Sequence, residues 1–252
     1  MSYDRSWRKT SFETSGYFTP GTKWLLIVNT GMFVFRMLAS LWPPVDRFLM
    51  LVLALMPEAV LRHFAIWQLA TYMFLHGGFE HILFNMLALW MCGSMLERDW
   101  GTRRFLRYYF VCGIGAGLCD VVLNAALGHW DTRTIGASGG IYGLLLAFGV
   151  LYPNQPVYMY FLFPIRAKYL VMIYGAVAFL GALRVNTGVS HVAHLGGMVF
   201  GYAYLKLRLR PIKMFNWRAL RGEYQAWKLR RARKRFQVYM RKRGSDRDPW
   251  IN

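Results

Sequence analysis

The sequence predicts an all-α membrane protein that crosses the bilayer six times. Hydrophobic residues make up 56% of the 252 residues, which is more than soluble domains usually contain. They gather in six apolar runs, and most of the charged residues fall between these runs or near the two ends of the chain. One helical membrane domain with polar tails therefore fits the pattern better than two soluble domains.

Each expected span is an apolar run bordered by polar or charged residues. A membrane helix needs about 20 mostly apolar residues, and several of the runs are somewhat shorter or contain glycine. The six expected spans cover residues 22–41, 79–96, 105–127, 136–152, 169–183 and 189–205. An even number of spans leaves both ends of the chain on the same side of the membrane.

A long segment, residues 42–78, separates the first two spans. It contains an apolar run at 49–55, followed by Pro57 and Trp67. Because this run is too short to cross the bilayer, we expect the segment to lie in or near the outer interface. The alternative is a malformed seventh span, which would move the C-terminus outside.

The distribution of Lys and Arg predicts the orientation. With the N-terminus inside, the inner segments before residue 206 hold ten of these cations and the outer segments hold four. The positive-inside rule then puts both termini in the cytoplasm. Arg36, near the outer end of the first span, is expected to snorkel to the interface.

The expected domain organisation has three parts. Residues 1–21 form a cytoplasmic N-terminal tail, which lacks the apolar core of a signal peptide, so the first span should direct insertion. Residues 22–205 form the six-span domain, and residues 206–252 form a cytoplasmic C-terminal tail. A bacterial cytoplasmic membrane is the expected location.

The C-terminal tail is strongly basic. It holds 16 Lys and Arg residues against three acidic residues, within a total net charge of +19. Four large side chains recur in it at helical spacing: Trp217, Leu220, Tyr224 and Trp227. This pattern predicts an interfacial helix on the anionic inner leaflet. Charge alone would also attract nucleic acid, but lipid is the nearer polyanion, so lipid is the expected partner and nucleic acid is not.

Two residues with catalytic potential lie in different spans. Ser138 stands among small residues at the start of the fourth span, and His194 lies in the sixth. At 1.5 Å per residue, Ser138, His194 and Asn85 each lie roughly 9 Å below the outer surface. Polar groups inside a bilayer are costly and indicate function. A hydroxyl and an imidazole at one depth are the nucleophile and base of a serine hydrolase.

Other polar and small residues fit supporting roles at the same site. The backbone N–H of Ser138 and the Asn85 side chain, assisted by His81, are the expected donors to an oxyanion. Tyr142, one turn after Ser138, is expected to pack against His194. Pairs of glycines should bring the fourth and sixth spans close together, namely Gly136 with Gly140, Gly139 with Gly143, and Gly197 with Gly201.

Several alternatives remain open from the residues alone. His191, one turn before His194, is a second candidate base. Asp120 could complete a triad, although we favour a partner for it in a loop or at a helix end. A metal site would have to use the histidines at 76, 81, 191 and 194, but no His-Glu-x-x-His element is present. No metal or other cofactor is expected, and Cys92, Cys112 and Cys119 are expected to be small core residues.

The motifs of this chain resemble those of a known family. The matching pieces are Trp67-Gln68, His76, the stretch from His81 to Asn85, Leu96-Glu97 with Gly101 and Phe105, Gly136-Ala137-Ser138-Gly139 with Tyr142, and Ala193-His194 with Gly197 and Gly201. In this order, over roughly residues 22–205, the sequence resembles the rhomboid family of intramembrane serine proteases.

The resemblance implies a six-helix core and a mechanism. It implies a Ser138–His194 dyad without an acid, an oxyanion site formed by His81, Asn85 and the Ser138 amide, and substrates that are transmembrane proteins. Residues 169–183 and 184–190 would control substrate access, and Glu97 would occupy a structural ion-pair position. Tyr72 departs from the relatives that carry a second histidine there. A non-catalytic relative that binds client helices is the alternative function.

Overall fold

The computed structural model describes residues 18–159, 163–183, 190–209 and 228. Contacts divide the chain into two units, residues 1–206 and 207–252, and the account below concerns the first. The interfacial helix predicted for the basic tail and most of the predicted access loop before His191 lie outside the described residues.

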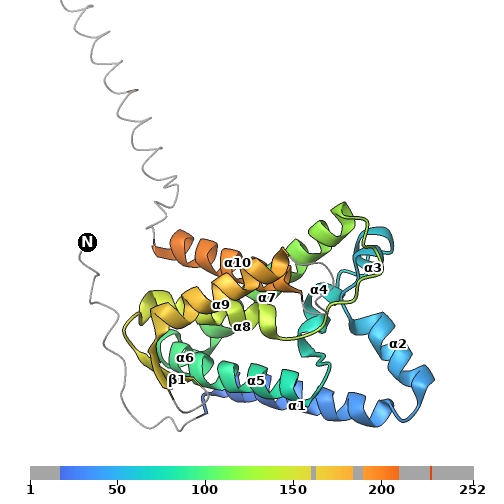
Figure 1. The fold of residues 1–252 in the computed structure, drawn as a ribbon, viewed down its shortest axis with the longest axis horizontal. Helices are drawn as coiled ribbons and strands as arrows, with labels where there is room; N and C mark the ends of the chain where they lie inside the picture. Colours follow the sequence, from blue (N-terminus) through green and yellow to red (C-terminus); the bar gives the residue numbers. More distant parts are fainter. Residues whose placement is uncertain (1–17, 160–162, 184–189, 210–227, 229–252) are drawn as a thin grey trace, which may run out of the picture. The chain divides into compact units, whose positions relative to one another are not determined.

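The described part of the chain is mostly helical (Figure 1). The elements are, in chain order, α1 (Pro20–Ala39), α2 (Pro43–Leu53), α3 (Pro57–Arg62), α4 (Gln68–Thr71), the 3₁₀ turn η2 (Tyr72–Phe74), α5 (Phe79–Ala88), the π-helical turn η3 (Leu89–Gly93), α6 (Ser94–Trp100), α7 (Thr102–Ala126), α8 (Ser138–Leu151), β1 (Pro156–Met159), β2 (Phe163–Arg166), α9 (Ala167–Ala182) and α10 (His191–Leu209).

A helix stands at each of the six expected spans. The second span is the continuous run from α5 through α6, and the others are α1, α7, α8, α9 and α10. Two of these helical runs, Phe79–Trp100 and Thr102–Ala126, are long and apolar enough to cross a membrane by length and composition. Ser138–Leu151 and Ala167–Ala182 are apolar but shorter. The six-span count therefore stays a prediction.

The core of the first unit forms around α7 and α8, which make the most extensive contact between elements. Tyr108, Tyr109 and Cys112 of α7 and Leu144 of α8 are fully buried there. Cys92 is also buried and Cys119 partly so, and all three cysteines are free. The predicted core role of the cysteines thus agrees with where they lie.

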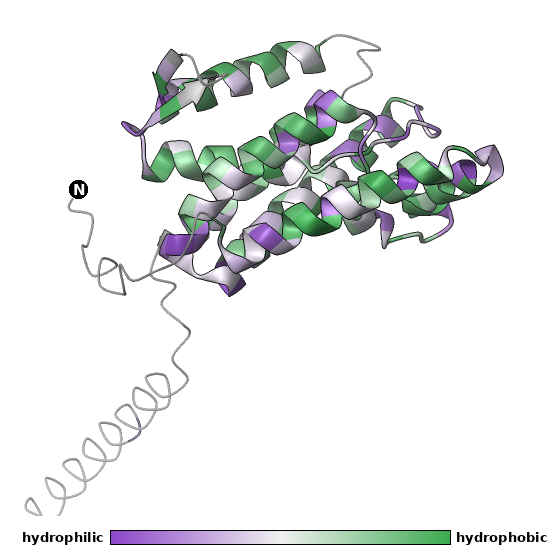
Figure 2. Cartoon of the chain, turned by 90° about the horizontal axis from the view of Figure 1, so that it is seen from below, coloured by the Kyte–Doolittle hydropathy of each residue, from purple (hydrophilic) through white to green (hydrophobic). Residues whose placement is uncertain are grey.

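Large apolar side chains cover the outside of the helices. Ile27 and Phe35 on α1 and Met172, Phe179 and Leu180 on α9 are each more than half exposed, and hydrophobic colour predominates along the helices in Figure 2. An apolar surface of this extent is unfavourable in water and matches the acyl chains of a bilayer.

Glu97 on α6 joins the starts of two other helices. Its carboxylate accepts hydrogen bonds from Thr19 Oγ1 (2.5 Å), from the backbone N–H groups of Gly21 and Thr22 (both 2.7 Å), and from Thr102 Oγ1 (2.6 Å). The ion pair implied by the resemblance stays a prediction: the partners that the described residues supply in these bonds are all neutral. The carboxylate satisfies N–H groups in the first turn of α1, which have no acceptor within the helix.

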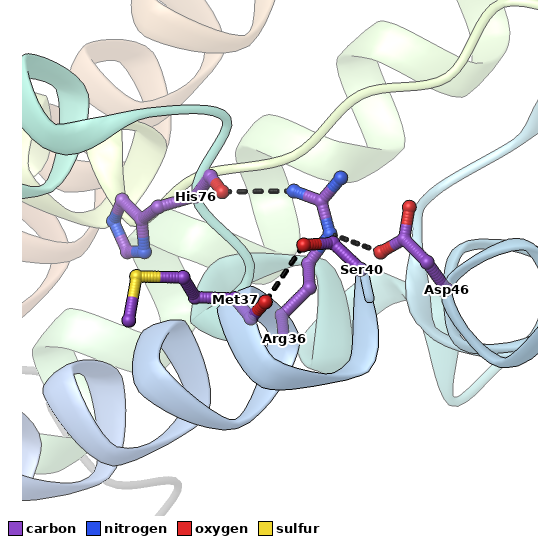
Figure 3. Close-up of polar contacts among 5 residues, drawn as sticks. All are labelled: Arg36, Met37, Ser40, Asp46 and His76. Carbon is purple, nitrogen blue, oxygen red and sulfur yellow. Dashed lines mark hydrogen bonds and ion pairs between the residues drawn. The ribbon is translucent and has the colours of Figure 1, made fainter. Parts of the chain in front are cut away.

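Arg36 has two polar partners. Its Nε forms an ion pair with Asp46 of α2 (3.0 Å), and its Nη1 donates to the backbone carbonyl of His76 (2.9 Å). That the guanidinium lies at the membrane interface stays a prediction. Figure 3 shows the guanidinium between these two partners, with the His76 ring turned away. A charge inside a membrane protein is less costly when it is paired. The ion pair connects α1 to α2, and the hydrogen bond to His76 connects α1 to the segment before α5.

The segment between the first two expected spans folds into short helices. No residue of α2 is fully buried. Side chains at or beside α4 bind the last carbonyls of α2, namely Trp67 to Val52 and Gln68 to Leu51 (both 2.9 Å) and Thr71 to Leu53 (2.8 Å). The position of this segment in the outer interface stays a prediction.

A small antiparallel hairpin, β1–β2, corrects the expectation of an all-α chain. Val157 pairs with Ile165, and the Ala167 N–H extends the pairing to the Gln155 carbonyl (2.9 Å). Four-residue strands are too short to show clear alternation in sequence, and a proline in each strand weakens the signal further.

Candidate active site

Ser138 is the first residue of α8, and the chain approaches it through a constrained turn. The Gly136 N–H donates to the Tyr72 carbonyl (2.9 Å), and Gly136 has φ = +127°, which residues with a side chain rarely adopt. Gly136 therefore precedes the helix instead of packing within it, contrary to the glycine pairing expected for the fourth span. At the first position of a helix the Ser138 N–H has no acceptor within the helix.

His194 of α10 contacts Ser138 directly. Its Nε2 lies 2.8 Å from Ser138 Oγ, although the two residues are 56 positions apart in sequence. Its other nitrogen, Nδ1, is buried without a hydrogen-bond partner in the described structure. The Tyr142 ring is stacked on the imidazole, with a centroid distance of 4.1 Å and an interplanar angle of 7°. The structure therefore places a hydroxyl beside an imidazole that is stacked on an aromatic ring, and within the described residues no acid is hydrogen-bonded to that imidazole.

Glycines permit this approach of α8 and α10. A Cβ at Gly197 would lie 2.0 Å from the Gly139 carbonyl oxygen, and one at Gly201 would lie 3.3 Å from Gly143 Cα. Gly140 instead faces α7, where a Cβ would lie 2.8 Å from the Tyr109 ring. Two of the expected glycine pairs, at 139/143 and 197/201, thus line the contact between the two helices.

Two side chains of α5, the element before α8 in the predicted site, are the expected oxyanion donors. Asn85 is 7% exposed, and its Nδ2 is buried without a partner in the described residues. His81 Nδ1 accepts the Gly77 N–H (3.4 Å), so a neutral imidazole carries its proton on Nε2. A Cβ at Gly136 would lie 2.8 Å from that Nε2 and 3.7 Å from Ser138 Oγ. The missing side chain of Gly136 leaves room between His81 Nε2 and Ser138 Oγ.

His191, His76 and Asp120 have other partners, and Ser138 Oγ is hydrogen-bonded to His194. A Cβ at Gly181 of α9 would lie 2.5 Å from the His191 ring, so this imidazole lies against α9. His76 lies edge-on to His81, and burial, followed by the charge of His81, lowers the pKa of His76 to about 3.

Asp120 binds hydroxyl groups of Thr134 and Ser190 rather than His194. Among the described residues, no three His, Cys, Asp or Glu side chains form a group that could hold a metal ion.

The sequence of this chain matches the model of one protein family. The rhomboid domain matches residues 63–211, a range that contains α5, α8 and α10 with their polar residues. The chain belongs to the rhomboid family. The resemblance seen in the motifs is therefore confirmed. Membership of the rhomboid family, together with the apolar helices, indicates an integral membrane protein.

Individual relatives agree with the rhomboid assignment. The chain is 33% identical to rhomboid protease GluP of Bacillus subtilis strain 168 over 136 residues, which cover 54% of this chain and 25% of that protein. It is 32% identical to rhomboid protease AarA of Providencia stuartii over 159 residues, 54% of this chain and 53% of that protein. Rhomboid-like protease 5 of Toxoplasma gondii is 33% identical over 149 residues, 59% of this chain and 17% of that protein. The chain thus spans only part of the length of these curated relatives.

Sequence reasoning about the rhomboid site missed two residues that touch Asp120. Thr134 and Ser190 each lie four positions before a residue of the Ser138–His194 pair and bind the Asp120 carboxyl group. Ser190 carried a local signal, because a serine just before an apolar helix is a favoured N-cap. Thr134 carried none, since its partner is distant in sequence.

Proposed function

We propose that this chain is an intramembrane serine endopeptidase that cleaves transmembrane proteins through a Ser138–His194 dyad. The observation that carries the proposal is the 2.8 Å contact between His194 Nε2 and Ser138 Oγ across two helices. Membership of a family with relatives named as proteases supports the same reaction class. No cofactor takes part in the proposed reaction.

Acylation is the first half of the proposed reaction. Ser138 Oγ attacks the carbonyl carbon of the scissile peptide bond while its proton moves to His194 Nε2. The oxyanion that forms receives hydrogen bonds from the Ser138 N–H, the Asn85 side-chain amide and His81 Nε2–H. His194 then gives its proton to the leaving nitrogen, the C–N bond breaks, and an acyl-enzyme remains on Ser138.

Deacylation repeats these steps with water. A water molecule gives a proton to His194 and attacks the acyl carbon, and the proton returns to Ser138 Oγ as the ester bond breaks. Water would reach the site from the outer side, and the substrate laterally, near α9. A substrate helix must unwind before its backbone can be attacked, so helix-weakening residues near the cut should be favoured.

The proposed setting is a bacterial cytoplasmic membrane, with six spans and both termini inside. The excess of Lys and Arg in the inner segments supports this orientation. The protease domain would cover residues 22–205, flanked by cytoplasmic tails at 1–21 and 206–252. The basic C-terminal tail would bind anionic lipid of the inner leaflet.

Replacement of Ser138 by alanine tests the proposal. The purified protein is reconstituted in vesicles with a reporter transmembrane substrate, and product is measured for wild type and Ser138→Ala. Cleavage should be abolished in the variant while its expression and melting temperature stay unchanged, because only the nucleophile is lost. Residual cleavage in Ser138→Ala would refute the assignment of the nucleophile.

Labelling with a fluorophosphonate separates the protease from a non-catalytic relative that only binds client helices. The probe reacts with an activated serine and needs no knowledge of the substrate. Wild type should be labelled, and labelling should be lost in both Ser138→Ala and His194→Ala. Wild-type protein that is folded yet unlabelled would favour the binding function.

A further inference from the structure

Asp120 is a buried acid that belongs to neither helix of the proposed dyad. It lies on α7, is 1% exposed, and has no ion pair in the described part of the chain. Oδ2 accepts a hydrogen bond from Thr134 Oγ1 (2.8 Å), and Oδ1 accepts one from the Ser190 hydroxyl. Asn124, one turn further along α7, donates to Oδ1 as well (3.1 Å). Two separate chain segments thus meet at one carboxyl group.

The first of these segments leads into Ser138. The backbone of Thr134 pairs with that of Leu55 in both directions (2.9 and 3.0 Å), and the next turn is fixed by the bond from Gly136 to Tyr72. These bonds attach the segment to η2 and to Leu55, two residues after the end of α2. The Thr134 side chain adds an attachment to α7, four residues before the nucleophile.

The second segment leads into His194. Ser190 Oγ accepts the Ala193 N–H (3.1 Å), which is the geometry of a helix N-cap, and the Ser190 carbonyl accepts the His194 N–H (3.3 Å). Because the Ser190 hydroxyl donates its own proton to Asp120, the carboxyl group fixes the cap and with it the first turn of α10. His194 lies at the end of that turn.

We propose that Asp120 is a positioning residue that sets the spacing between Ser138 and His194 by holding both approach segments. The proposal rests on the proposed function, because spacing matters only if the pair reacts. Asp120 touches neither reacting atom and acts through Thr134 and Ser190. A displacement of about 1 Å between reacting groups costs on the order of 100-fold in rate. Losing both attachments should therefore lower turnover with little effect on substrate binding.

The test compares Asp120→Leu, which has a similar shape and no acceptor, with Asp120→Asn, which retains one. Asn124→Ala is the matched control, because it removes a bond to Asp120 within α7 and leaves both cross-links intact. For each folded variant we would measure kcat and KM on a reporter substrate, fluorophosphonate labelling of Ser138, and hydrogen exchange at the Ala193 and His194 amides.

For Asp120→Leu we expect kcat and the labelling rate to fall by roughly 10- to 100-fold, with KM changed less than about 2-fold. Exchange at the start of α10 should become faster. Asp120→Asn should recover part of the loss, and Asn124→Ala should behave as wild type. A folded Asp120→Leu protein with wild-type kcat and wild-type exchange would overturn the proposal.

Variants of Thr134 and Ser190 test the same role if Asp120→Leu cannot be used. If Asp120→Leu does not fold, Thr134→Val and Ser190→Ala remove one attachment each, and wild-type kcat in both would reject the inference. If both lower kcat, the double variant should lose less than the product of the two effects, because the two hydroxyl groups bind the same carboxyl group. If wild type itself is unlabelled, the proposed function fails, while unchanged exchange in Asp120→Leu would reject the positioning role separately.

Discussion

At the scale of residues, the imidazole of the proposed dyad packs against aromatic rings. His194 Nδ1 has no acceptor in the described structure, so no carboxylate is in contact to stabilise the imidazolium formed during acylation. The Tyr142 ring is stacked on that imidazole and the His191 ring lies edge-on to it (centroid distance 5.9 Å), and an aromatic face attracts a cation. Stabilisation of the transition state therefore depends mainly on the donors that face the oxyanion.

Replacing Asn85 by alanine tests this dependence. Because its Nδ2 has no partner in the resting structure, its loss should cost little stability. Loss of one oxyanion donor lowers kcat by about 100- to 1,000-fold in serine proteases, so Asn85→Ala should lose activity while its melting temperature stays near that of wild type. The measurement is kcat in vesicles together with a thermal melt.

Asn29→Ala is the matched control for Asn85. Asn29 is also buried, but its amide donates to the Leu25 carbonyl within α1 (2.8 Å). This variant should lose some stability and keep its turnover. The opposite pattern, with Asn85→Ala unstable and active, would assign Asn85 to structure.

At the scale of elements, the contact between α8 and α10 decides whether the two reactive groups meet. The backbones approach so closely at Gly139 and Gly197 that no side chain fits between them. Van der Waals packing over such small residues is a main source of helix association in membranes. The same contact therefore contributes to stability and brings His194 to Ser138.

Gly197→Ala should separate these helices. The added Cβ would meet the Gly139 carbonyl oxygen at 2.0 Å, so α10 must shift. Overpacking of this kind costs about 1–3 kcal/mol, and we expect a lower melting temperature and a loss of fluorophosphonate labelling.

Gly31→Ala is the control for that substitution. Gly31 lies inside α1, where a Cβ would meet nothing within 4 Å. Alanine is the better helix former by about 0.5–1 kcal/mol, so this variant should melt at or above the wild-type temperature with full labelling. Equal behaviour of the two glycine variants would contradict the close-contact argument.

At the scale of the whole molecule, a few polar side chains join separate helices. Glu97 connects the starts of α1 and α7 to α6, and Arg36 connects α1 to α2 and to the segment before α5 (Figure 3). In an apolar surrounding such bonds have few competitors, so each fixes how its helices are arranged.

Glu97→Gln tests the connection at the start of α1. The amide would turn one acceptor into a donor against hydroxyl and N–H groups that already donate. We expect a loss of about 2–3 kcal/mol in unfolding free energy, because buried donors lose their acceptor. The measurement is thermal or denaturant unfolding in detergent.

Glu58→Gln provides the comparison for Glu97→Gln. Glu58 forms an ion pair with Arg62 in the same short helix (3.2 Å), and the Arg62 side chain is 54% exposed. Exposed pairs of this kind contribute about 0–1 kcal/mol, so its melting temperature should stay close to wild type. A Glu97→Gln protein as stable as Glu58→Gln would show that the carboxylate does not hold α1.

The sequence by itself determined where the helices lie and which residues could react. Apolar runs of membrane length specify helices locally, because a backbone in lipid must satisfy its own hydrogen bonds. The motifs around Asn85, Ser138 and His194 were enough to indicate the family, since few chemistries use a serine and a histidine within apolar runs.

Only the tertiary structure decided which of these residues meet. The contact of Ser138 with His194, the bonds from Glu97 to the start of α1 and the bond from Asp120 to Ser190 join segments more than 50 residues apart, and the ion pair of Arg36 joins two consecutive helices. Periodicity along a chain reports which side of a helix is apolar. It carries no information on which other helix that side will face, because the packing of all the helices together sets that choice.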